Sequence, residues 1–366
     1  MKQLSVCICG GGNLAHVTGG YLASMQEYDV RLLTRHPERW LPDHTLTVTD
    51  CNGKTFHSRF SVITSDPQTA VQGADMILLC LPGFAIASAL ESIKPFIGPK
   101  TLVGSIVSST GFFLMAKKIV PSQTGLFGFQ RVPFIARTQE YGRSASLLGY
   151  KPSLAFATMN IENPSNLEAM LSRMFSVPVH WLDSHLKVTL TNSNPLLHPS
   201  RLYGMFNKRT EFDSKILFYE DWDNLSSETL IACDNEFGLL LSKLGVSRDD
   251  IPSLLTYYES SDADSLTRKI RSIQAFKGLY APMVELPDGH FKPDFGNRYF
   301  SEDIPFGILI IKGYCSKYGI ATPTIDKVIY WAQAGMQKDY LNDGVLNGKD
   351  LDTTIVPYIL NSCNHA

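Results

Sequence analysis

The stretch Leu4 to Ala15, LSVCICGGGNLA, decides the fold of this chain, because an apolar run ends there in a glycine-rich turn. The run Leu4 to Cys9 predicts a short buried strand. Gly10, Gly12 and Ala15 then follow with GxGxxA spacing, which dinucleotide-binding turns need for a tight bend, for close approach to a pyrophosphate and for close packing of helix on strand. Glycine-rich turns also occur as plain loops, but strand, turn and helix come here in the order that a cofactor site requires.

The segments beside this turn supply further candidates for cofactor binding. The expected helix, Ala15 to Met25, would direct its N-terminal N–H groups and its dipole toward the phosphates, with Asn13 inside the turn. Leu81 and Pro82 end a second apolar run, Met76 to Leu81, at the edge of the sheet where ligands of this fold bind. We therefore expect the backbone of Leu81 and Pro82 to line the cofactor cleft.

The residues after the second strand bear on which nicotinamide cofactor is bound. NAD-binding units place an acidic residue there, about 20 residues beyond the glycines, to bind the ribose 2′-hydroxyl. This chain has Thr34 and Arg35 instead. Because a guanidinium forms charge-assisted bonds to phosphate oxygens, the pair favours NADP over NAD. The alternative is that Arg35 is simply a solvated arginine at the end of a strand.

Length, charge and cysteine content restrict the class of protein. The 366 residues are long for one core and sufficient for two domains. The balance of 33 lysines and arginines against 35 aspartates and glutamates favours small-molecule partners and speaks against nucleic acid or an anionic membrane surface. No apolar run reaches the ~20 residues of a membrane span, and the N-terminus lacks the pattern of a signal peptide. We expect a cytoplasmic protein, and the sequence leaves a homodimer open.

The seven cysteines include no CxxC pair, and several lie inside apolar runs. This distribution predicts reduced, mostly buried thiols and neither a disulfide framework nor a metal site. The cysteines are Cys7, Cys9, Cys51, Cys80, Cys233, Cys315 and Cys363.

Strand-like apolar runs alternate with helical stretches in the first half of the chain. This alternation predicts an α/β domain of the Rossmann type, with a doubly wound, mostly parallel sheet and helices on both faces. The expected strands are Leu4–Cys9, Asp29–Leu33, Met76–Leu81, Leu102–Val107, Thr124–Phe129, Leu154–Thr158 and Val179–Leu182, with a hairpin of Leu46–Thr49 and Lys54–Phe56 around Asn52 and Gly53. We expect this dinucleotide-binding domain to comprise residues 1–185.

Helical patterns dominate the second half, residues 186–366, which predicts an all-α domain. Ser226 begins an expected helix whose apolar residues repeat at helical spacing up to Gly245. Ser301 is expected to begin another helix, with acids in its first turn, and Thr324 to cap a last long helix that extends to Tyr340. This domain would complete a site over the cofactor.

Two segments of the second half carry residues suited to catalysis. His198 lies in NPLLHP, Asn194 to Pro199, just after the expected domain boundary, where a cleft between domains would bind ligands. Taken alone, a histidine between apolar residues and a proline is more often structural. Arg298 to Gly307, RYFSEDIPFG, brings a cation, aromatic rings and two acids to a helix start, although acids there also act as ordinary caps.

Together these segments resemble the opine dehydrogenase family, which includes octopine and nopaline dehydrogenases and the bacterial N-(1-carboxyethyl) amino acid dehydrogenases. The resemblance extends over nearly the whole chain, through GGGNLAH at the start, FGFQRVPFIAR (Phe127–Arg137), NPLLHPSRL (Asn194–Leu202) and RYFSEDIPFG (Arg298–Gly307). It implies a dinucleotide domain followed by a helical domain. It also implies an enzyme that condenses a 2-oxo acid with the amino group of an amino acid and reduces the imine with hydride from NAD(P)H.

The resemblance implies roles for individual residues as well. His198 would move protons near neutral pH, and Asp303 would hold its ring tautomer and stabilise its charged form. Arg298 would bind the carboxylate of the 2-oxo acid. Gln130 and Arg137 are candidates for the floor of the cleft or for a second carboxylate.

Asn207 to Asp223 departs from the family pattern, and we expect this region to shape the amine pocket. Two other functions remain open. A reductase of 2-oxo or hydroxy acids, related to ketopantoate reductase, would have the same two-domain build, but such enzymes use a lysine base and leave His198 and Asp303 unexplained. A non-catalytic NADP-binding sensor would keep the fold without the chemistry, and the presence of His, Asp and Arg together argues against it.

Overall fold

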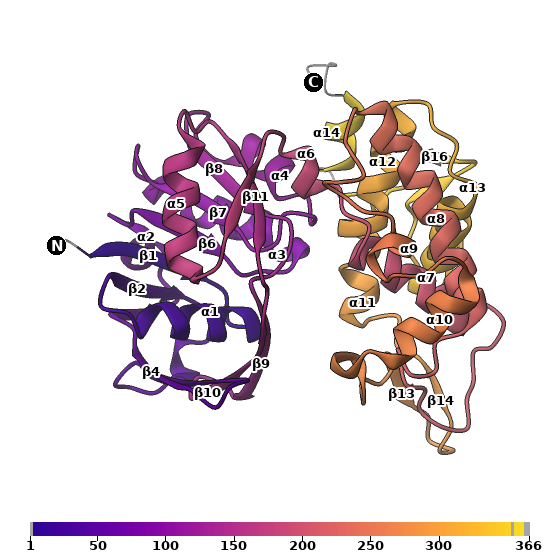
Figure 1. Ribbon diagram of the computed structural model, residues 1–366, viewed down its shortest axis with the longest axis horizontal. Coiled ribbons are helices and arrows are strands. Elements are labelled where there is room, and N and C mark those ends of the chain that lie inside the picture. The colour runs from indigo at the N-terminus through magenta and orange to yellow at the C-terminus, as the bar shows by residue number, and fades with distance from the viewer. Residues whose placement is uncertain (1–2, 353–354, 362–366) are drawn as a thin grey trace. The chain divides into compact units, whose positions relative to one another are not determined.

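The computed structural model describes residues 3–352 and 355–361, and the chain divides into two compact units, Met1–Thr189 and Leu190–Ala366 (Figure 1). The six cysteines in the described part carry free thiols, and all of them except Cys51 are buried. Cys363 lies outside the described residues. No helix of the described residues is long and apolar enough to cross a membrane.

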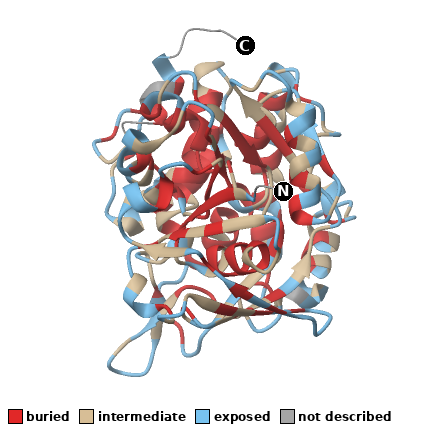
Figure 2. Ribbon diagram, turned by 90° about the vertical axis from the view of Figure 1, so that its left-hand side faces the viewer, coloured by how far each residue is buried: buried red, intermediate tan, exposed pale blue. Residues whose placement is uncertain are grey.

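The first unit is built on an eight-stranded sheet in the order β12-β11-β8-β7-β6-β1-β2-β5. Its strands are β1 (Leu4–Cys9), β2 (Tyr28–Leu33), β5 (Val62–Thr64), β6 (Met76–Leu79), β7 (Leu102–Ser105), β8 (Gly125–Phe129), β11 (Leu154–Met159) and β12 (Val179–Leu182). All neighbouring strands run parallel except β8 and β11, so the prediction of a mostly parallel sheet is confirmed. Buried residues follow the central strands (Figure 2), and β6 is buried along its whole length, as a strand covered on both faces must be.

Helices follow six of these eight strands. They are α1 (Asn13–Ala23), α2 (Pro67–Val71), α3 (Gly83–Ile93), α4 (Phe112–Ile119), α5 (Pro164–Phe175) and α6 (Leu186–Thr189). Several bounds differ from the sequence prediction: α1 begins at Asn13 and ends at Ala23, β6 ends at Leu79, and β7 ends at Ser105. The shorter strands leave the residues that follow them free to form the ligand-binding edge of the sheet.

A second, four-stranded sheet in the order β4-β3-β10-β9 was not predicted. Its strands are β3 (Thr45–Asp50), β4 (Thr55–Arg59), β9 (Phe134–Glu140) and β10 (Ser144–Tyr150), so the expected hairpin is present as β3 and β4. Helix α1 packs against both sheets (Figure 1). Two adjacent glycines permit this, because a Cβ on Gly19 would lie 2.8 Å from the Phe60 ring and a Cβ on Gly20 would lie 2.6 Å from Val48.

The second unit is helical, as predicted, with two short hairpins in addition. Its helices are α7 (Asn194–Phe206), α8 (Asn224–Lys243), α9 (Leu254–Tyr257), α10 (Ala263–Ser272), α11 (Arg298–Ser301), α12 (Leu309–Lys317), α13 (Pro323–Met336) and α14 (Val356–Asn361). The hairpins are β13 (Met283–Glu285) with β14 (Phe291–Pro293), and β15 (Leu341–Asn342) with β16 (Val345–Leu346). A π-helical turn, Ile304–Ile308, precedes α12.

The predicted starts of three helices in this unit were wrong. Helix α8 begins before Ser226, because the Asp223 carboxylate accepts the Ser226 N–H and caps the helix. Ser301 ends α11 instead of beginning a helix, and the side chain of Asn297 is the cap.

Helix α13 is capped from outside its own sequence. The carboxylate of Glu236, on α8, accepts hydrogen bonds from the N–H groups of Thr324 and Ile325 at 2.7 and 2.9 Å. Thr324 is therefore inside the helix and is not its cap, and α13 ends at Met336, short of the predicted Tyr340. An acid at the positive end of the helix dipole is stabilising.

Candidate functional site

The glycine turn between β1 and α1 has the geometry that a bound dinucleotide needs. Gly10 has a φ of +143°, and a Cβ there would lie 2.6 Å from the carbonyl oxygen of Cys80, so only glycine fits. A Cβ on Gly12 would meet no atom within 4 Å. No side chain in the described part of the chain caps α1, which leaves its first N–H groups for a phosphate. Ala15, fully buried, lets the helix approach the strand.

Gly11 is a third glycine of this turn, and two side chains lie close to it. A Cβ there would lie 2.5 Å from the Tyr141 hydroxyl and 2.8 Å from the Thr34 hydroxyl. The Arg39 guanidinium lies 3.9 Å from the centre of the Tyr141 ring, a cation–π contact. Sequence analysis did not single out Tyr141 or Arg39, because neither lies in a motif and both reach the turn from segments distant in the chain.

The residues predicted to bind the cofactor follow β1, β2 and β6, which are neighbours in the sheet. Because these strands are parallel, their carboxyl ends share one edge. Thr34, directly after β2, is buried, whereas Arg35 is exposed and makes no hydrogen bond, ion pair or ring contact with any other described residue. After β6, Leu81 is half-buried and Pro82 is exposed.

Asn13 has a structural contact in addition to its predicted role. Its side-chain oxygen accepts a hydrogen bond from the backbone N–H of Thr138, on β9, at 2.9 Å. This bond joins the glycine turn to the four-stranded sheet. The side-chain nitrogen of Asn13 is the atom that can turn to a ligand.

Gln130 and Arg137, the remaining candidates of the first unit, lie in different sheets. Gln130 follows β8 of the main sheet, and its amide nitrogen donates to the carbonyl oxygen of Lys187 at 2.8 Å. Arg137 is exposed on β9, where it pairs with Ser146 of β10. The two residues therefore do not form one cluster in the way that the residues of the second unit do.

His198 and Asp303 lie together in the second unit. Nδ1 of His198 is 2.8 Å from Oδ2 of Asp303, and Nε2 is 3.1 Å from the hydroxyl oxygen of Tyr219. A carboxylate can only accept, so in the neutral ring Nδ1 carries the proton and the Tyr219 hydroxyl donates to Nε2. Both His198 and Tyr219 are buried, at 6% exposure each, so this chain of hydrogen bonds is shielded from water.

The local sequence explains why the histidine and the aspartate meet. A Cβ on Gly307, in the π-helical turn, would lie 3.2 Å from the Cα of Pro195, near the start of α7. Glycine therefore permits the turn that follows Asp303 to pack closely on the helix that carries His198. The ring of Tyr299 packs edge-on against the imidazole, with centroids 4.6 Å apart.

Arg298 is the first residue of α11, five positions before the aspartate in the sequence. Its side chain is exposed, and its guanidinium has no hydrogen bond, ion pair or ring contact with another described residue. An exposed guanidinium without a partner among the described residues is available to an anionic ligand.

Tyr219 is the residue of this cluster that sequence analysis missed. It lies in the region Asn207 to Asp223, which was expected to shape the amine pocket. Burial, with the neighbouring Tyr299 as the second cause, raises the pKa of Tyr219 above its ordinary value, so the hydroxyl keeps its proton.

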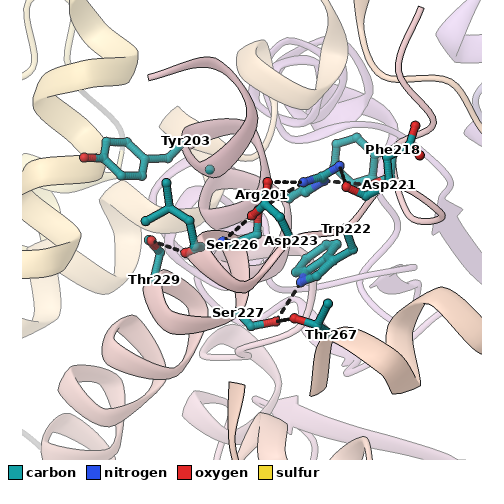
Figure 3. A network of polar contacts seen from close by, with 12 residues as sticks. Arg201, Tyr203, Phe218, Asp221, Trp222, Asp223, Ser226, Ser227, Thr229 and Thr267 are labelled. Atoms are coloured by element: carbon teal, nitrogen blue, oxygen red, sulfur yellow. Dashed lines mark hydrogen bonds and ion pairs between the residues drawn. The ribbon is translucent and has the colours of Figure 1, made fainter. Parts of the chain in front are cut away.

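Arg201, also on α7, binds Phe218, Asp221 and Asp223, the residues that surround Tyr219 in the sequence (Figure 3). Its Nε donates to the carbonyl oxygen of Phe218 at 2.7 Å, and its Nη2 donates to that of Asp221 at 2.7 Å. Nη1 forms an ion pair with the Asp223 carboxylate at 3.1 Å. The side chain is fully buried, and burial lowers the pKa of Arg201 to about 10. These bonds offset the cost of burying the charge and fix the backbone on both sides of Tyr219.

Two protein-family models match the chain. The α-helical domain of NAD/NADP octopine/nopaline dehydrogenases matches residues 181–336, and ketopantoate reductase PanE/ApbA matches residues 6–134. The second match covers only the dinucleotide-binding part, and the first covers the segment with His198 and Asp303.

Full-length similarity is found with named dehydrogenases. Octopine dehydrogenase from Pecten maximus is 33% identical over 97% of this chain and 96% of that protein. Tauropine dehydrogenase from Arabella iricolor is 32% identical over 96% of both chains. A structure of octopine dehydrogenase with NADH and pyruvate superimposes with a TM-score of 0.85 at 31% identity, covering 98% of this chain and 95% of that one. The chain therefore belongs to the octopine and opine dehydrogenase family.

Proposed function

We propose that this protein is an NAD(P)H-dependent opine dehydrogenase, which joins a 2-oxo acid to the amino group of an amino acid and reduces the imine. The observation that carries the proposal is the buried hydrogen bond between His198 and Asp303, with the unpaired Arg298 on the same segment as the aspartate. Family membership supports the same reaction. Pyruvate is the first 2-oxo acid to test, because a similar octopine dehydrogenase structure holds it.

The reaction needs a group that moves protons near neutral pH. Condensation releases water, and the imine nitrogen must gain a proton as its carbon is reduced. We assign these transfers to His198, since imidazole changes charge in that pH range. Asp303, which accepts the Nδ1 proton, would hold the ring in one tautomer and stabilise the imidazolium. With its pyrophosphate at the glycine turn, the cofactor would supply the hydride from its reduced nicotinamide.

Carboxylate binding is assigned to Arg298. Its planar guanidinium offers two parallel donors to a carboxylate and would orient the carbon that is reduced. Gln130 and Arg137 remain candidates for the cleft floor or a second carboxylate. Of the two, Arg137 is the better candidate for an anion, because the amide nitrogen of Gln130 already donates to Lys187.

For the cofactor we propose a preference for NADPH. Gly10, Gly12, Asn13, Ala15, Leu81 and Pro82 would hold the dinucleotide, and Thr34 with Arg35 would bind the 2′-phosphate. The exposed and unpaired state of Arg35 supports this, because no partner in the described part of the chain competes for its charge. The similar octopine dehydrogenase structure contains NADH, so both cofactors must be compared.

The deciding experiment follows NADPH and NADH oxidation for a matrix of 2-oxo acids with and without amino acids. An opine dehydrogenase consumes cofactor only when both substrates are present. A ketopantoate-reductase-like enzyme would consume it with the 2-oxo acid alone, and a sensor would bind it without turnover on any pair. Either of the last two results contradicts the proposal.

The cellular compartment and the oligomeric state of the protein are proposed separately. We propose the cytoplasm, because the six described cysteines carry free thiols, as a reducing compartment permits. A homodimer is tested by the mass of the protein in solution.

A further inference from the structure

We propose that Tyr219 is a catalytic residue whose hydroxyl passes a proton between Nε2 of His198 and the nitrogen of the substrate. This inference rests on the proposed function as an opine dehydrogenase. It comes from the region Asn207 to Asp223, to which neither the motifs nor the family resemblance assigns a catalytic group.

The hydrogen bonds of the imidazole carry the first step of the argument. Each ring nitrogen has one position for a hydrogen bond in the plane of the ring. Asp303 occupies the position at Nδ1, and Tyr219 occupies the position at Nε2. A proton that leaves His198 from Nε2 therefore meets the Tyr219 oxygen first.

The packing of Tyr219 carries the second step, because it prevents the ring from swinging away. The ring stacks on Phe276 with centroids 4.1 Å apart and an interplanar angle of 19°, and it packs edge-on against Phe218 at 4.8 Å. The backbone is fixed by Arg201, which binds the carbonyl oxygens of Phe218 and Asp221. A substrate cannot reach Nε2 by a simple rotation of this side chain.

The proton transfer balances without a charged tyrosine. In the reduction, His198 starts as imidazolium, and its Nε2–H bond breaks as a new O–H bond forms on Tyr219. The original O–H bond of Tyr219 breaks at the same time, and its proton forms the N–H bond of the product, while the carbon receives hydride from the cofactor. Tyr219 ends as a phenol, His198 ends neutral and Asp303 stays ionised. The raised pKa of Tyr219 agrees with a path that forms no phenolate.

The test compares Tyr219→Phe with Tyr340→Phe. Tyr340 is a suitable control because it is a buried tyrosine of the same unit, at 3% exposure, and its hydroxyl has no bond to His198. Each purified variant is checked by thermal unfolding and by cofactor binding. We then measure kcat and KM with the best substrate pair, and kcat in mixtures of H2O and D2O.

A relay predicts that Tyr219→Phe lowers kcat by about 10²-fold or more, the usual scale for a positioned proton donor, while KM for the 2-oxo acid changes little. The parent and Tyr340→Phe should show a curved dependence of kcat on the D2O fraction, because two protons move together. A Tyr219→Phe enzyme with parental or higher kcat would show that the hydroxyl only covers Nε2, and would overturn the inference.

The test also covers a variant that does not fold and a parent protein that is inactive. If Tyr219→Phe does not fold, the measurement on the parent enzyme tests the relay. A linear dependence of its kcat on the D2O fraction would mean that only one proton is transferred in the rate-limiting step, which contradicts the relay. A parent protein that turns over no pair of substrates contradicts the opine dehydrogenase function itself, and this is seen before any variant is made.

Discussion

Nδ1 of His198 lies 2.8 Å from Oδ2 of Asp303, although the two residues are 105 positions apart in the chain. Their contact depends on a helix and a π-helical turn that touch at Pro195 and Gly307. The pair is therefore part of the packed interior of the second unit, and its geometry does not depend on the ordering of a surface loop.

The pair should behave as one catalytic unit. His198→Ala is expected to lower kcat by about 10²-fold or more, because a positioned acid or base is lost. Asp303→Asn should act in the same direction, and the double variant should lose much less than the product of the two effects, since members of a unit are not additive. Steady-state kinetics of the three variants measure this.

The neighbouring acid provides the control for that comparison. Glu302→Gln removes a carboxylate from the same segment and should keep kcat near the parental value. Cofactor affinity, measured by fluorescence, should equal the parental value in all four variants. Full additivity of His198→Ala and Asp303→Asn would show that Asp303 supports only the fold.

Arg298→Lys should impair the enzyme although the charge is kept, because lysine cannot form the two parallel bonds of a guanidinium. The expected change is a higher KM for the 2-oxo acid, with smaller changes for the amine and the cofactor. Arg268→Lys, which changes an exposed arginine on α10 of the same unit, is the control. Parental kinetics of Arg298→Lys, or a loss that falls mainly on NADPH, would remove the assignment.

Arg35→Ala should raise the KM for NADPH and leave the KM for NADH almost unchanged, because only NADPH has a 2′-phosphate. Arg59→Ala, an exposed arginine at the end of β4, should affect neither value. Initial rates with each cofactor give the comparison. Equal losses with both cofactors would mean that Arg35 acts on the fold and not on the phosphate.

His185 should make the free energy of unfolding depend on pH. Burial, with Lys117 as the second cause, lowers the pKa of His185 to about 4 from an unfolded value of about 6.5. The unfolded chain thus binds the proton more readily, so the stabilisation is complete above pH ~6.5 and is lost as the pH falls toward ~4. The loss should be on the order of 1–3 kcal/mol.

Urea unfolding at pH 7 and at pH 4.5 measures this effect. His185→Gln should reduce the difference in unfolding free energy between the two values, because glutamine does not titrate. His57→Gln, an exposed histidine on β4, should leave the difference unchanged. An unaltered difference in His185→Gln would assign the pH dependence to other groups.

The main sheet was predictable because its signals are local. The glycine turn and the apolar runs are continuous in sequence, and β1 coincides with the predicted Leu4–Cys9. In the four-stranded sheet, β3 and β4 were predicted as a hairpin but β9 and β10 were missed, because their signal is weaker. Strand β9, Phe134–Glu140, lies at an edge of its sheet and buries only Phe134. Its sequence, FIARTQE, therefore lacks the alternation of apolar and polar residues that predicts a strand.

The contact between His198 and Asp303 was predictable because motifs carry both residues. His198, Asp303 and Arg298 came from short segments that resemble a family. Tyr219 could not be found in that way, because it lies in irregular backbone whose position depends on bonds from Arg201. The cap of α11 had a readable signal, since Asn297 directly before Arg298 is a common N-cap residue.

The bonds from Arg201 also bear on how such an enzyme can evolve. The segment 207–211 lies between the end of α7 and Phe212, whose backbone N–H and carbonyl group pair with Phe291 on β14. Insertions, deletions or exchanges within these five residues should therefore leave Tyr219 against His198, because Arg201 binds the backbone on both sides of Tyr219. A sequence that retains Arg201 should therefore keep the hydrogen bond between Tyr219 and His198 while this segment changes.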